Sequence, residues 1–225
     1  LRYQLIDRPV DVGKWRLEVF GGTRLIYNDF TYYEDSLLAQ HRALAETDTP
    51  DGRTLADLLE GTEDHVLWIL NLGLLWDTRD QEFVPTRGTF TELSFRASPG
   101  IEQDLTFAGV TLSTAWFASV HEDILVAATR AVVDLQAGAV PFYEQASFGA
   151  FAPAFGPGGG RSVRGVPLQR FAGKLKALLN LELRARLLPF EVFGQKINLG
   201  LIGFADTGRV WADFETFTLG GAPID

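Results

Sequence analysis

Two arginines in a glycine-rich stretch, and two acidic residues further along the chain, have the types that ion pairing needs. Residues 158–166 are Gly-Gly-Gly-Arg-Ser-Val-Arg-Gly-Val, and the second cation of this stretch is Arg164. Glycine permits backbone angles that other residues disfavour, so the stretch is expected to form a loop. Glu182 and Asp206 each lie within a strand-like run that follows. The spacing leaves two interpretations open: the acids are solvated on a polar face, or Arg164 folds inward and pairs with them.

The sequence supports a catalytic role for these residues less well than it supports ion pairing. Glu182 and Asp206 have the residue types of a carboxylate dyad, but the two arginines in the preceding loop favour ion pairing. The sequence has three His and no Gly-x-Ser-x-Gly motif, and the glycines at 158–160 are not followed by the Lys-Ser or Lys-Thr of a phosphate loop. The absence of Cys excludes disulfides and thiolate chemistry. We therefore expect no enzyme activity, no catalytic residue, no cofactor and no metal site.

The segments around these residues alternate between apolar and polar positions, which predicts β-strands. In residues 174–187 one face is apolar: Leu175, Ala177, Leu179, Leu181, Leu183, Ala185 and Leu187. The opposite face is polar apart from Leu178. Residues 66–79 alternate in the same way, with Trp68 and Trp76 near the two ends of the apolar face. This placement suits the aromatic girdles of a membrane barrel, although the core strand of a soluble β-sandwich stays open as an alternative.

The composition narrows the class of protein. The 225 residues are 46% hydrophobic and carry a net charge of −9, which argues against a nucleic-acid-binding surface. No apolar run approaches the ~18–20 residues of a membrane helix, whereas the strands of a membrane barrel need only ~9–11 alternating residues. The chain starts without Met inside a strand-like run, so we expect it to be part of a longer protein.

The alternation predicts eight strands, at residues 1–6, 14–27, 66–79, 89–97, 105–117, 124–136, 174–187 and 198–210. Short turns are predicted at 7–13, 80–88, 119–123 and 189–194, and long connections at 28–65 and 137–173. The connection at 99–104 is the one exception to this alternation, because it is short where a long connection is expected. Outer-membrane barrels have short turns on one side and longer loops on the other. The expected fold class is therefore all-β: a transmembrane antiparallel β-barrel with long extracellular loops.

Residues 28–65 differ from the strands in composition. They contain ten acidic residues against Arg42 and Arg53, a difference that accounts for most of the net charge. Short helices are predicted at 36–45 and 54–59. A solvated acidic loop is the favoured interpretation over a specific binding site. His41 and His65 lie among the acids and make a divalent cation conceivable, but their spacing matches neither an EF-hand nor a zinc site.

Five stretches, in this order along the chain, resemble the bacterial surface antigen family of outer-membrane assembly and translocation barrels, to which BamA and TamA belong. They are residues 85–88, 141–144, 158–165, 180–184 and 204–211, and the resemblance covers Trp68 to Trp211. Each stretch alone is a weak signal, whereas the ordered set is specific. The family usually has an aromatic residue after Val-Arg-Gly, where this chain has Val166.

The resemblance implies a barrel of sixteen strands, of which this chain would supply about strands six to thirteen. Residues 28–65 would form an acidic extracellular loop, and residues 137–173 a long loop that folds into the lumen. The POTRA domains and the final strands would lie outside this chain. The resemblance also implies a lock between loop and wall, formed by Val163, Arg164, Gly165, Glu182 and Asp206, with support from Gly159, Gly160, Phe204 and Gly208.

The function that the resemblance implies is folding and insertion of β-barrel proteins into the bacterial outer membrane. Its expected partners are nascent outer-membrane β-barrel proteins, accessory lipoproteins or periplasmic subunits, and outer-membrane lipid with lipopolysaccharide, but no nucleic acid. A TamA-like or two-partner-type translocation barrel is the alternative within the family. A passive porin would instead need an open lumen.

Overall fold

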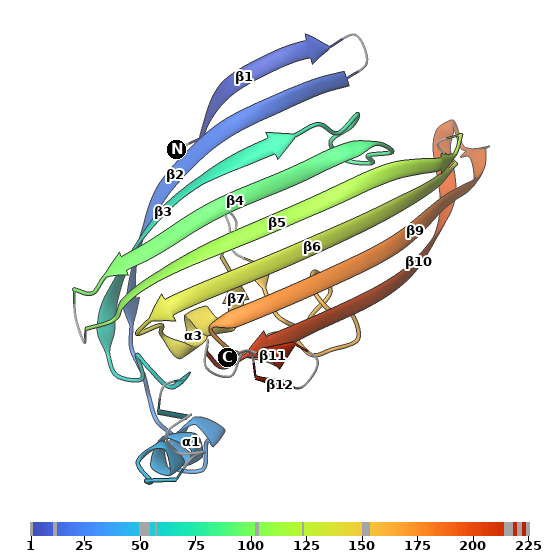
Figure 1. Cartoon of the computed structure of the whole chain (residues 1–225). Helices are drawn as coiled ribbons and strands as arrows, with labels where there is room; N and C mark the ends of the chain where they lie inside the picture. Colours follow the sequence, from blue (N-terminus) through green and yellow to red (C-terminus); the bar gives the residue numbers. More distant parts are fainter. Residues whose placement is uncertain are drawn as a thin grey trace.

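A single antiparallel sheet dominates the computed structural model, which describes residues 2–10, 13–49, 55–56, 58–101, 104–122, 124–149, 154–213, 218–219 and 222–223. Its eight strands are, in sheet order, β1 (Arg2–Val10), β2 (Gly13–Asn28), β3 (His65–Asp77), β4 (Gly88–Pro99), β5 (Thr106–His121), β6 (Leu125–Gly138), β9 (Leu175–Val192) and β10 (Gln195–Trp211) (Figure 1). Each strand of this sheet pairs with the sheet's next strand along the chain, so the predicted all-β antiparallel fold is confirmed, and the described residues form the eight predicted strands. Within the described residues β1 and β10 form the two edges of the sheet.

The alternation along each strand gives the sheet two different faces. In β3 the exposed apolar side chains are Trp68, Leu70, Leu72, Leu74 and Trp76. Leu67, Ile69 and Leu75 lie between them in sequence and are buried on the opposite face. An apolar face without a protein partner is what a barrel strand presents to lipid. The predicted parity of this strand is therefore confirmed.

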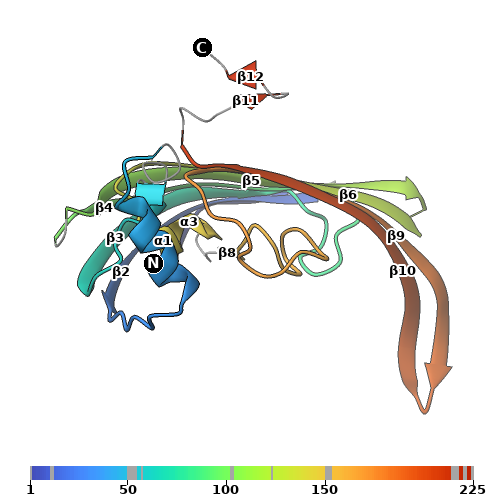
Figure 2. The ribbon, with the colours of Figure 1, turned by 90° about the horizontal axis from the view of Figure 1, so that it is seen from below.

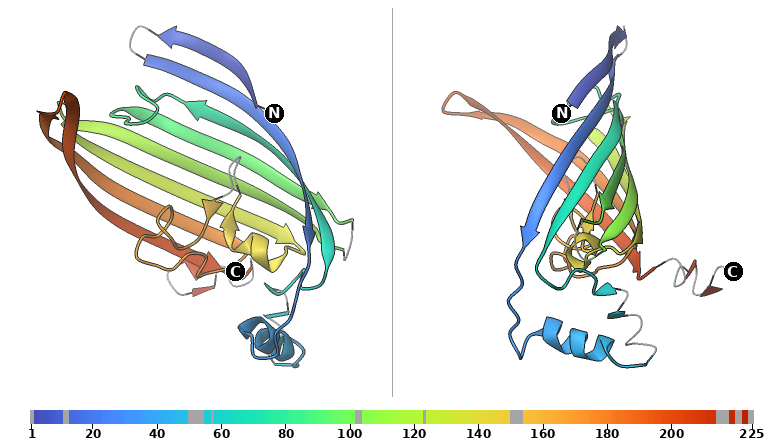
Figure 3. Two further views of the ribbon diagram at one scale, coloured as in Figure 1. Left: turned by 180° about the vertical axis from the view of Figure 1, so that it is seen from behind. Right: turned by 90° about the vertical axis from the view of Figure 1, so that its left-hand side faces the viewer.

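The sheet is strongly curved, and the long connection between β6 and β9 lies on its concave side (Figures 2 and 3). We call this connection, residues 139–174, the inner loop. It carries the short helix α3 (Phe142–Gln145) and the two-residue strands β7 (Ser147–Phe148) and β8 (Ala154–Phe155). Two small buried clusters attach it to the wall. Val140 packs in one with Leu67, Ile69, Leu105 and Phe107, and Phe148 in the other with Val132 and Leu178.

The acidic connection between β2 and β3 carries the helix α1 (Leu37–Ala45), which lies beyond the end of the sheet (Figure 1). The hydroxyl of Ser36 caps it by accepting a hydrogen bond from the Ala39 N–H at 3.2 Å, so the predicted helix at 36–45 is confirmed. The predicted helix at 54–59 falls partly outside the described residues. In its described part the Leu59 N–H donates to the Leu55 carbonyl at 2.9 Å, which is a helical turn. No helix in the described part of the chain is long and apolar enough to cross a membrane.

Two turns are shorter than the predicted 7–13 and 189–194, because the strands before them continue through a proline. β1 continues through Pro9 to Val10, and β9 continues through Pro189 to Val192, where the turn is only Phe193–Gly194. β1 is an edge strand, and β9 has no β6 partner beyond Ala185, which pairs with Leu125. A strand that is paired on one side only tolerates proline, because no N–H is needed on its free side. The connections still alternate between short and long as predicted.

Beyond β10 the chain forms a small separate hairpin, β11 (Thr218–Leu219) with β12 (Ala222–Pro223).

Candidate functional site

The tip of the inner loop is held by an arginine between two carboxylates on neighbouring strands. The Arg164 guanidinium donates from Nη1 to Glu182 on β9 at 2.6 Å, and from Nε and Nη2 to Asp206 on β10, both at 2.6 Å. The backbone N–H of Arg164 also donates to Asp206 at 3.0 Å. The Asp206 side chain is 2% exposed and that of Arg164 is 23% exposed. Arg164 therefore folds inward and pairs with both acids, which decides between the two interpretations that the spacing left open.

Further polar groups surround this contact and fix its orientation. Asn180 on β9 donates to Asp206 at 2.7 Å and to the Ser162 carbonyl at 2.6 Å, so it links the loop to both strands. Arg184 Nε donates to the second oxygen of Glu182 at 2.8 Å. The Arg164 guanidinium also lies 3.8 Å from the centre of the Phe204 ring, a cation–π contact that occupies the face of the guanidinium. We call Arg164, Asn180, Glu182 and Asp206 the tip cluster.

Glycines give the loop tip its tight backbone. Gly159 has a φ of +96°, and its N–H donates to the Val166 carbonyl at 2.9 Å, which closes the turn. Gly165 has a φ of +85°, a value that disfavours residues with a Cβ. No neighbour lies within 4 Å of the Cβ that another residue would add at Gly160, so nothing in the structure explains that glycine. Val166 closes the turn through its backbone carbonyl, so this hydrogen bond does not depend on the side chain at position 166.

Val163 anchors the tip through apolar contacts on the same wall. Its side chain packs against the cluster of Val132, Phe148 and Leu178. A Cβ at Gly208 would lie 3.2 Å from both Val163 Cγ2 and the Ala177 carbonyl oxygen, so this strand position has little space for a side chain. The structure thus brings together the predicted residues Val163, Arg164, Glu182, Phe204, Asp206 and Gly208, with Gly159 and Gly165 shaping the turn.

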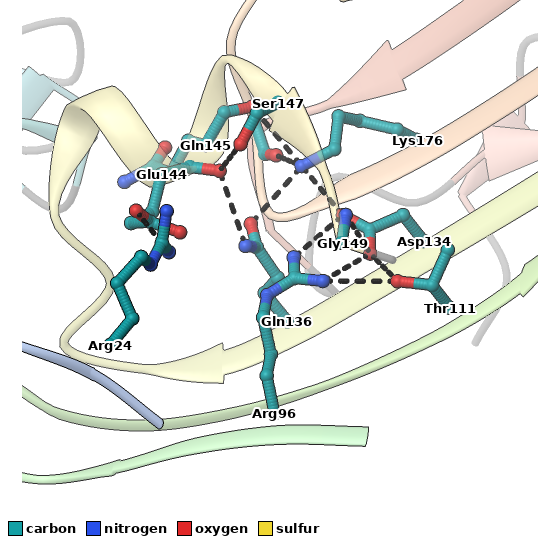
Figure 4. Close-up of polar contacts among 11 residues, drawn as sticks. Arg24, Arg96, Thr111, Asp134, Gln136, Glu144, Gln145, Ser147, Gly149 and Lys176 are labelled. Atoms are coloured by element: carbon teal, nitrogen blue, oxygen red, sulfur yellow. Dashed lines mark hydrogen bonds and ion pairs between the residues drawn. The ribbon is translucent and has the colours of Figure 1, made fainter. Parts of the chain in front are cut away.

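A second polar cluster, which the sequence did not predict, holds the base of the inner loop (Figure 4). Its centre is Asp134 on β6, whose side chain is fully buried. Arg96 on β4 donates to both Asp134 oxygens at 2.9 and 3.0 Å, and Lys176 on β9 lies 2.8 Å from one of them. The Thr111 hydroxyl and the N–H of Gly149 in the inner loop also donate to this carboxylate. A buried charge needs such partners, and here the strands and the loop supply them jointly.

Lys176 connects this carboxylate directly to the two ends of the inner loop. Its ammonium donates to the Gln145 and Gly173 carbonyls and to the Gln136 side chain, each at 3.1 Å. A side chain at Gly149 would displace the Arg96 guanidinium, because an added Cβ would lie 1.2 Å from Arg96 Nη1. We call Arg96, Asp134, Gln136, Gly149 and Lys176 the base cluster.

The predicted family motif at residues 141–144 forms a third contact beside the base cluster. Glu144 forms an ion pair with Arg24 on β2 at 2.7 Å (Figure 4). The Tyr143 hydroxyl lies 2.7 Å from His65 Nε2 and accepts from Asn28 at 2.8 Å. The ends of β2 and β3, and with them the acidic connection, are therefore fastened to the start of the inner loop.

A metal site at the two histidines gains no support. No three or more His, Asp or Glu side chains in the described part of the chain are arranged to hold a metal ion. His65 is instead buried and bonded to Tyr143 and to the Glu63 carbonyl.

The family of the chain follows from similarity to known proteins. A model of the Omp85 superfamily domain matches residues 15–221. The chain belongs to the Omp85 superfamily. The resemblance predicted from the ordered motifs is thereby confirmed, and the sheet of this Omp85 domain is part of an outer-membrane β-barrel. No curated protein matches the sequence.

A solved structure supports the same fold. The crystal structure of BamA from Haemophilus ducreyi lacking POTRA domains 1-3 is similar to this Omp85 domain, with a TM-score of 0.54 and 14% sequence identity. The match covers 90% of this chain and 39% of that one, so the chain spans about two fifths of its length.

Proposed function

We propose that this Omp85 domain belongs to an outer-membrane assembly factor that folds and inserts other β-barrel proteins. The observation that carries the proposal is the inner loop, bound to the concave wall by Arg164 between Glu182 and Asp206. Its family membership makes protein insertion or translocation the relevant class of function. A passive porin would need an open lumen, whereas here a loop with its own buried anchors lies against the inner wall.

In this proposal the described strands are about strands six to thirteen of a sixteen-stranded barrel in the bacterial outer membrane. The acidic connection between β2 and β3 faces the cell exterior, and POTRA domains and the final strands lie elsewhere in the protein. An open sheet edge in lipid leaves backbone groups unsatisfied, so these strands need neighbours on both sides.

The proposed mechanism needs neither an enzyme reaction nor a cofactor. A barrel that opens its seam exposes a row of unpaired N–H and C=O groups, and a client strand pairs with them. The seam lies outside the strands described, so no residue of this chain is assigned to it. The role of the inner loop is to keep the wall around β6, β9 and β10 in one arrangement while the seam moves.

The expected partners are nascent outer-membrane β-barrel proteins, accessory lipoproteins or periplasmic subunits, and outer-membrane lipid with lipopolysaccharide. The test is conditional depletion of the full-length protein in its host, followed by quantification of outer-membrane β-barrel proteins. We expect many of them to fall together while periplasmic intermediates accumulate. Loss of a single secreted or surface protein would contradict general insertion and identify a TamA-like or two-partner-type translocation barrel.

A further inference from the structure

A cavity of about 230 Å³ lies between the inner loop and the wall, beside the tip cluster. Its wall comes from β5, β6 and β9, and its roof from residues 160–162 and Arg164 of the loop. Four arginines line it: Arg130, Arg161, Arg164 and Arg184. The concentration of cations is unexpected in a chain whose net charge is −9.

These four arginines differ in whether they form an ion pair with a carboxylate. Arg164 is bonded to Glu182 and Asp206, and Arg184 shares Glu182 with it at 2.7 Å. Arg130 and Arg161 form no ion pair with any carboxylate of the described residues. Four arginines and one carboxylate, Glu182, line the cavity, and the arginines still outnumber the carboxylates by two when Asp206, the partner of Arg164, is counted as well.

Arg130 has unused donors on its guanidinium. Its Nε donates to the Asn180 side chain at 3.1 Å, and its Nη2 donates to the Arg161 carbonyl. Both acceptors are uncharged, and a guanidinium has five N–H donors, so three remain without an acceptor in the described part of the chain. A half-buried cation with free donors is electrostatically favourable for an anion that can reach it.

We propose that this cavity binds a carboxylate side chain of an acidic polypeptide segment in the barrel lumen. A carboxylate matches the fork of a guanidinium, and Arg130 with Arg161 supplies two of them. Phe117 lines the cavity, and Arg184 lies 5.6 Å from the centre of its ring, so the site also offers apolar surface to the rest of an amino-acid side chain. The cavity lies on the inner face of the wall, away from lipid, which favours a polypeptide over a lipid phosphate.

The anion site stands on the geometry alone, whereas its polypeptide occupant rests on the proposed function. Binding is therefore measured directly, on the purified full-length protein in detergent, with a fluorescent hexaglutamate peptide as the probe. Hexaglutamine with the same label is the control for peptide length. Inorganic phosphate and lipid vesicles that contain phosphatidylglycerol are competitors that distinguish a phosphate source from a carboxylate source.

We expect hexaglutamate to bind and hexaglutamine not to bind, and we expect salt to weaken the binding. Arg130→Gln should weaken it about tenfold, since a charge-assisted contact is lost. Arg161→Gln should weaken the binding of hexaglutamate several-fold. This variant is less prone to misfold, because the Arg161 side chain is exposed. The matched control is Arg170→Gln, an exposed arginine of the same loop that does not line the cavity.

Equal binding of both peptides, or unchanged binding in folded Arg130→Gln and Arg161→Gln, would overturn the site. Displacement of the probe by the lipid vesicles at concentrations where inorganic phosphate has no effect would overturn the polypeptide as occupant. The depletion experiment described above tests the proposed function separately. If hexaglutamate binds as expected but depletion of the protein leaves other β-barrel proteins unchanged, the proposed insertion function is disproved and the anion site still stands.

Discussion

The tip cluster and the base cluster bind the same loop to the same sheet and share strand β9, but they differ in their access to water. Asp134 and Lys176 of the base cluster are fully buried, whereas the Arg164 and Glu182 side chains of the tip cluster are 23% and 18% exposed. Along β9, Asn180 of the tip cluster lies four residues from Lys176 of the base cluster, which is roughly 13 Å. The cavity with its unpaired arginines adjoins the tip cluster only.

We infer from this difference that the inner loop is fixed at its base and more easily displaced at its tip. In a network of charges that is closed to water, removing one member leaves the others buried and unpaired. We therefore expect the base cluster to be all-or-none: the loss of one member should remove the stabilisation of the whole cluster. A partly hydrated pair loses less, because water replaces part of what the partner supplied. We therefore expect the base to determine folding, and the tip to determine the position of the loop in the folded protein.

The largest expected effect is that of Asp134→Ala in the base cluster. It strands Arg96 and Lys176 without their shared carboxylate, so the free energy of unfolding should fall by about 3–5 kcal/mol. The measurement is urea unfolding of the full-length protein in detergent. The folded fraction is read from the heat-modifiable migration of the barrel in gel electrophoresis. Glu191→Ala, an exposed carboxylate on the same strand as Lys176, is the control and should change stability by no more than about 0.5 kcal/mol. A loss below about 1 kcal/mol for Asp134→Ala would refute the all-or-none base.

Arg164→Ala should have the next largest effect on stability, and it should also release the inner loop in the folded protein. Loss of its charged hydrogen bonds should cost about 1.5–3 kcal/mol, because the pair is partly hydrated. Proteinase K should cleave the inner loop faster in the folded protein, and the level of client proteins in the outer membrane should fall. Arg170→Ala, in the same loop but exposed, is the matched control. Wild-type cleavage and wild-type client levels in Arg164→Ala would show that the tip contact is not a lock.

The tip cluster was predictable from sequence because each of its residues lies in a recognisable motif. Glu182 and Asp206 lie within clear strands, and Arg164 follows the glycines of the loop. Their spacing left the pairing open, and the family resemblance implied it. The alternation also assigned most strand faces correctly, since the period of two depends only on neighbouring residues. The ordered motifs then led to the right family.

The base cluster was not predictable, because its residues come together only through the strand register. Lys176 is the direct partner of Asp134 across β6 and β9, and Thr111 is its partner across β5 and β6. In the sequence these residues are ordinary members of polar strand faces, 23 to 42 positions apart. Knowing the register would have paired Asp134 with Lys176, but the role of Gly149 depends on how the loop folds back, which no local pattern encodes.

Two glycine substitutions test the difference between base and tip with smaller changes in stability. Gly149→Ala places a Cβ against the Arg96 guanidinium, which Asp134 prevents from moving away, and should cost about 1–3 kcal/mol. Gly165→Ala at the tip meets no neighbour within 4 Å and suffers only from its positive φ, so it should cost about 1 kcal/mol. Urea unfolding of both variants compares them directly. A larger loss for Gly165→Ala would reverse the proposed division between base and tip.

The smallest expected effect concerns Tyr143, which fastens the base of the inner loop to β2 and β3. Burial raises the pKa of its phenol above the usual value of about 10, and the adjacent Glu144 carboxylate raises it further. Since the folded protein holds this proton more tightly than the unfolded chain, the stability it contributes is complete below about pH 10 and is lost as the pH rises towards the folded pKa. Tyr143→Phe should cost about 1 kcal/mol at neutral pH, through the lost contacts with Asn28 and His65. Above pH 10 the variant should lose stability less steeply than the wild type, as urea unfolding at a series of pH values will measure. Parallel pH profiles for the two proteins would show that Tyr143 is hydrated and takes no part in fixing the base.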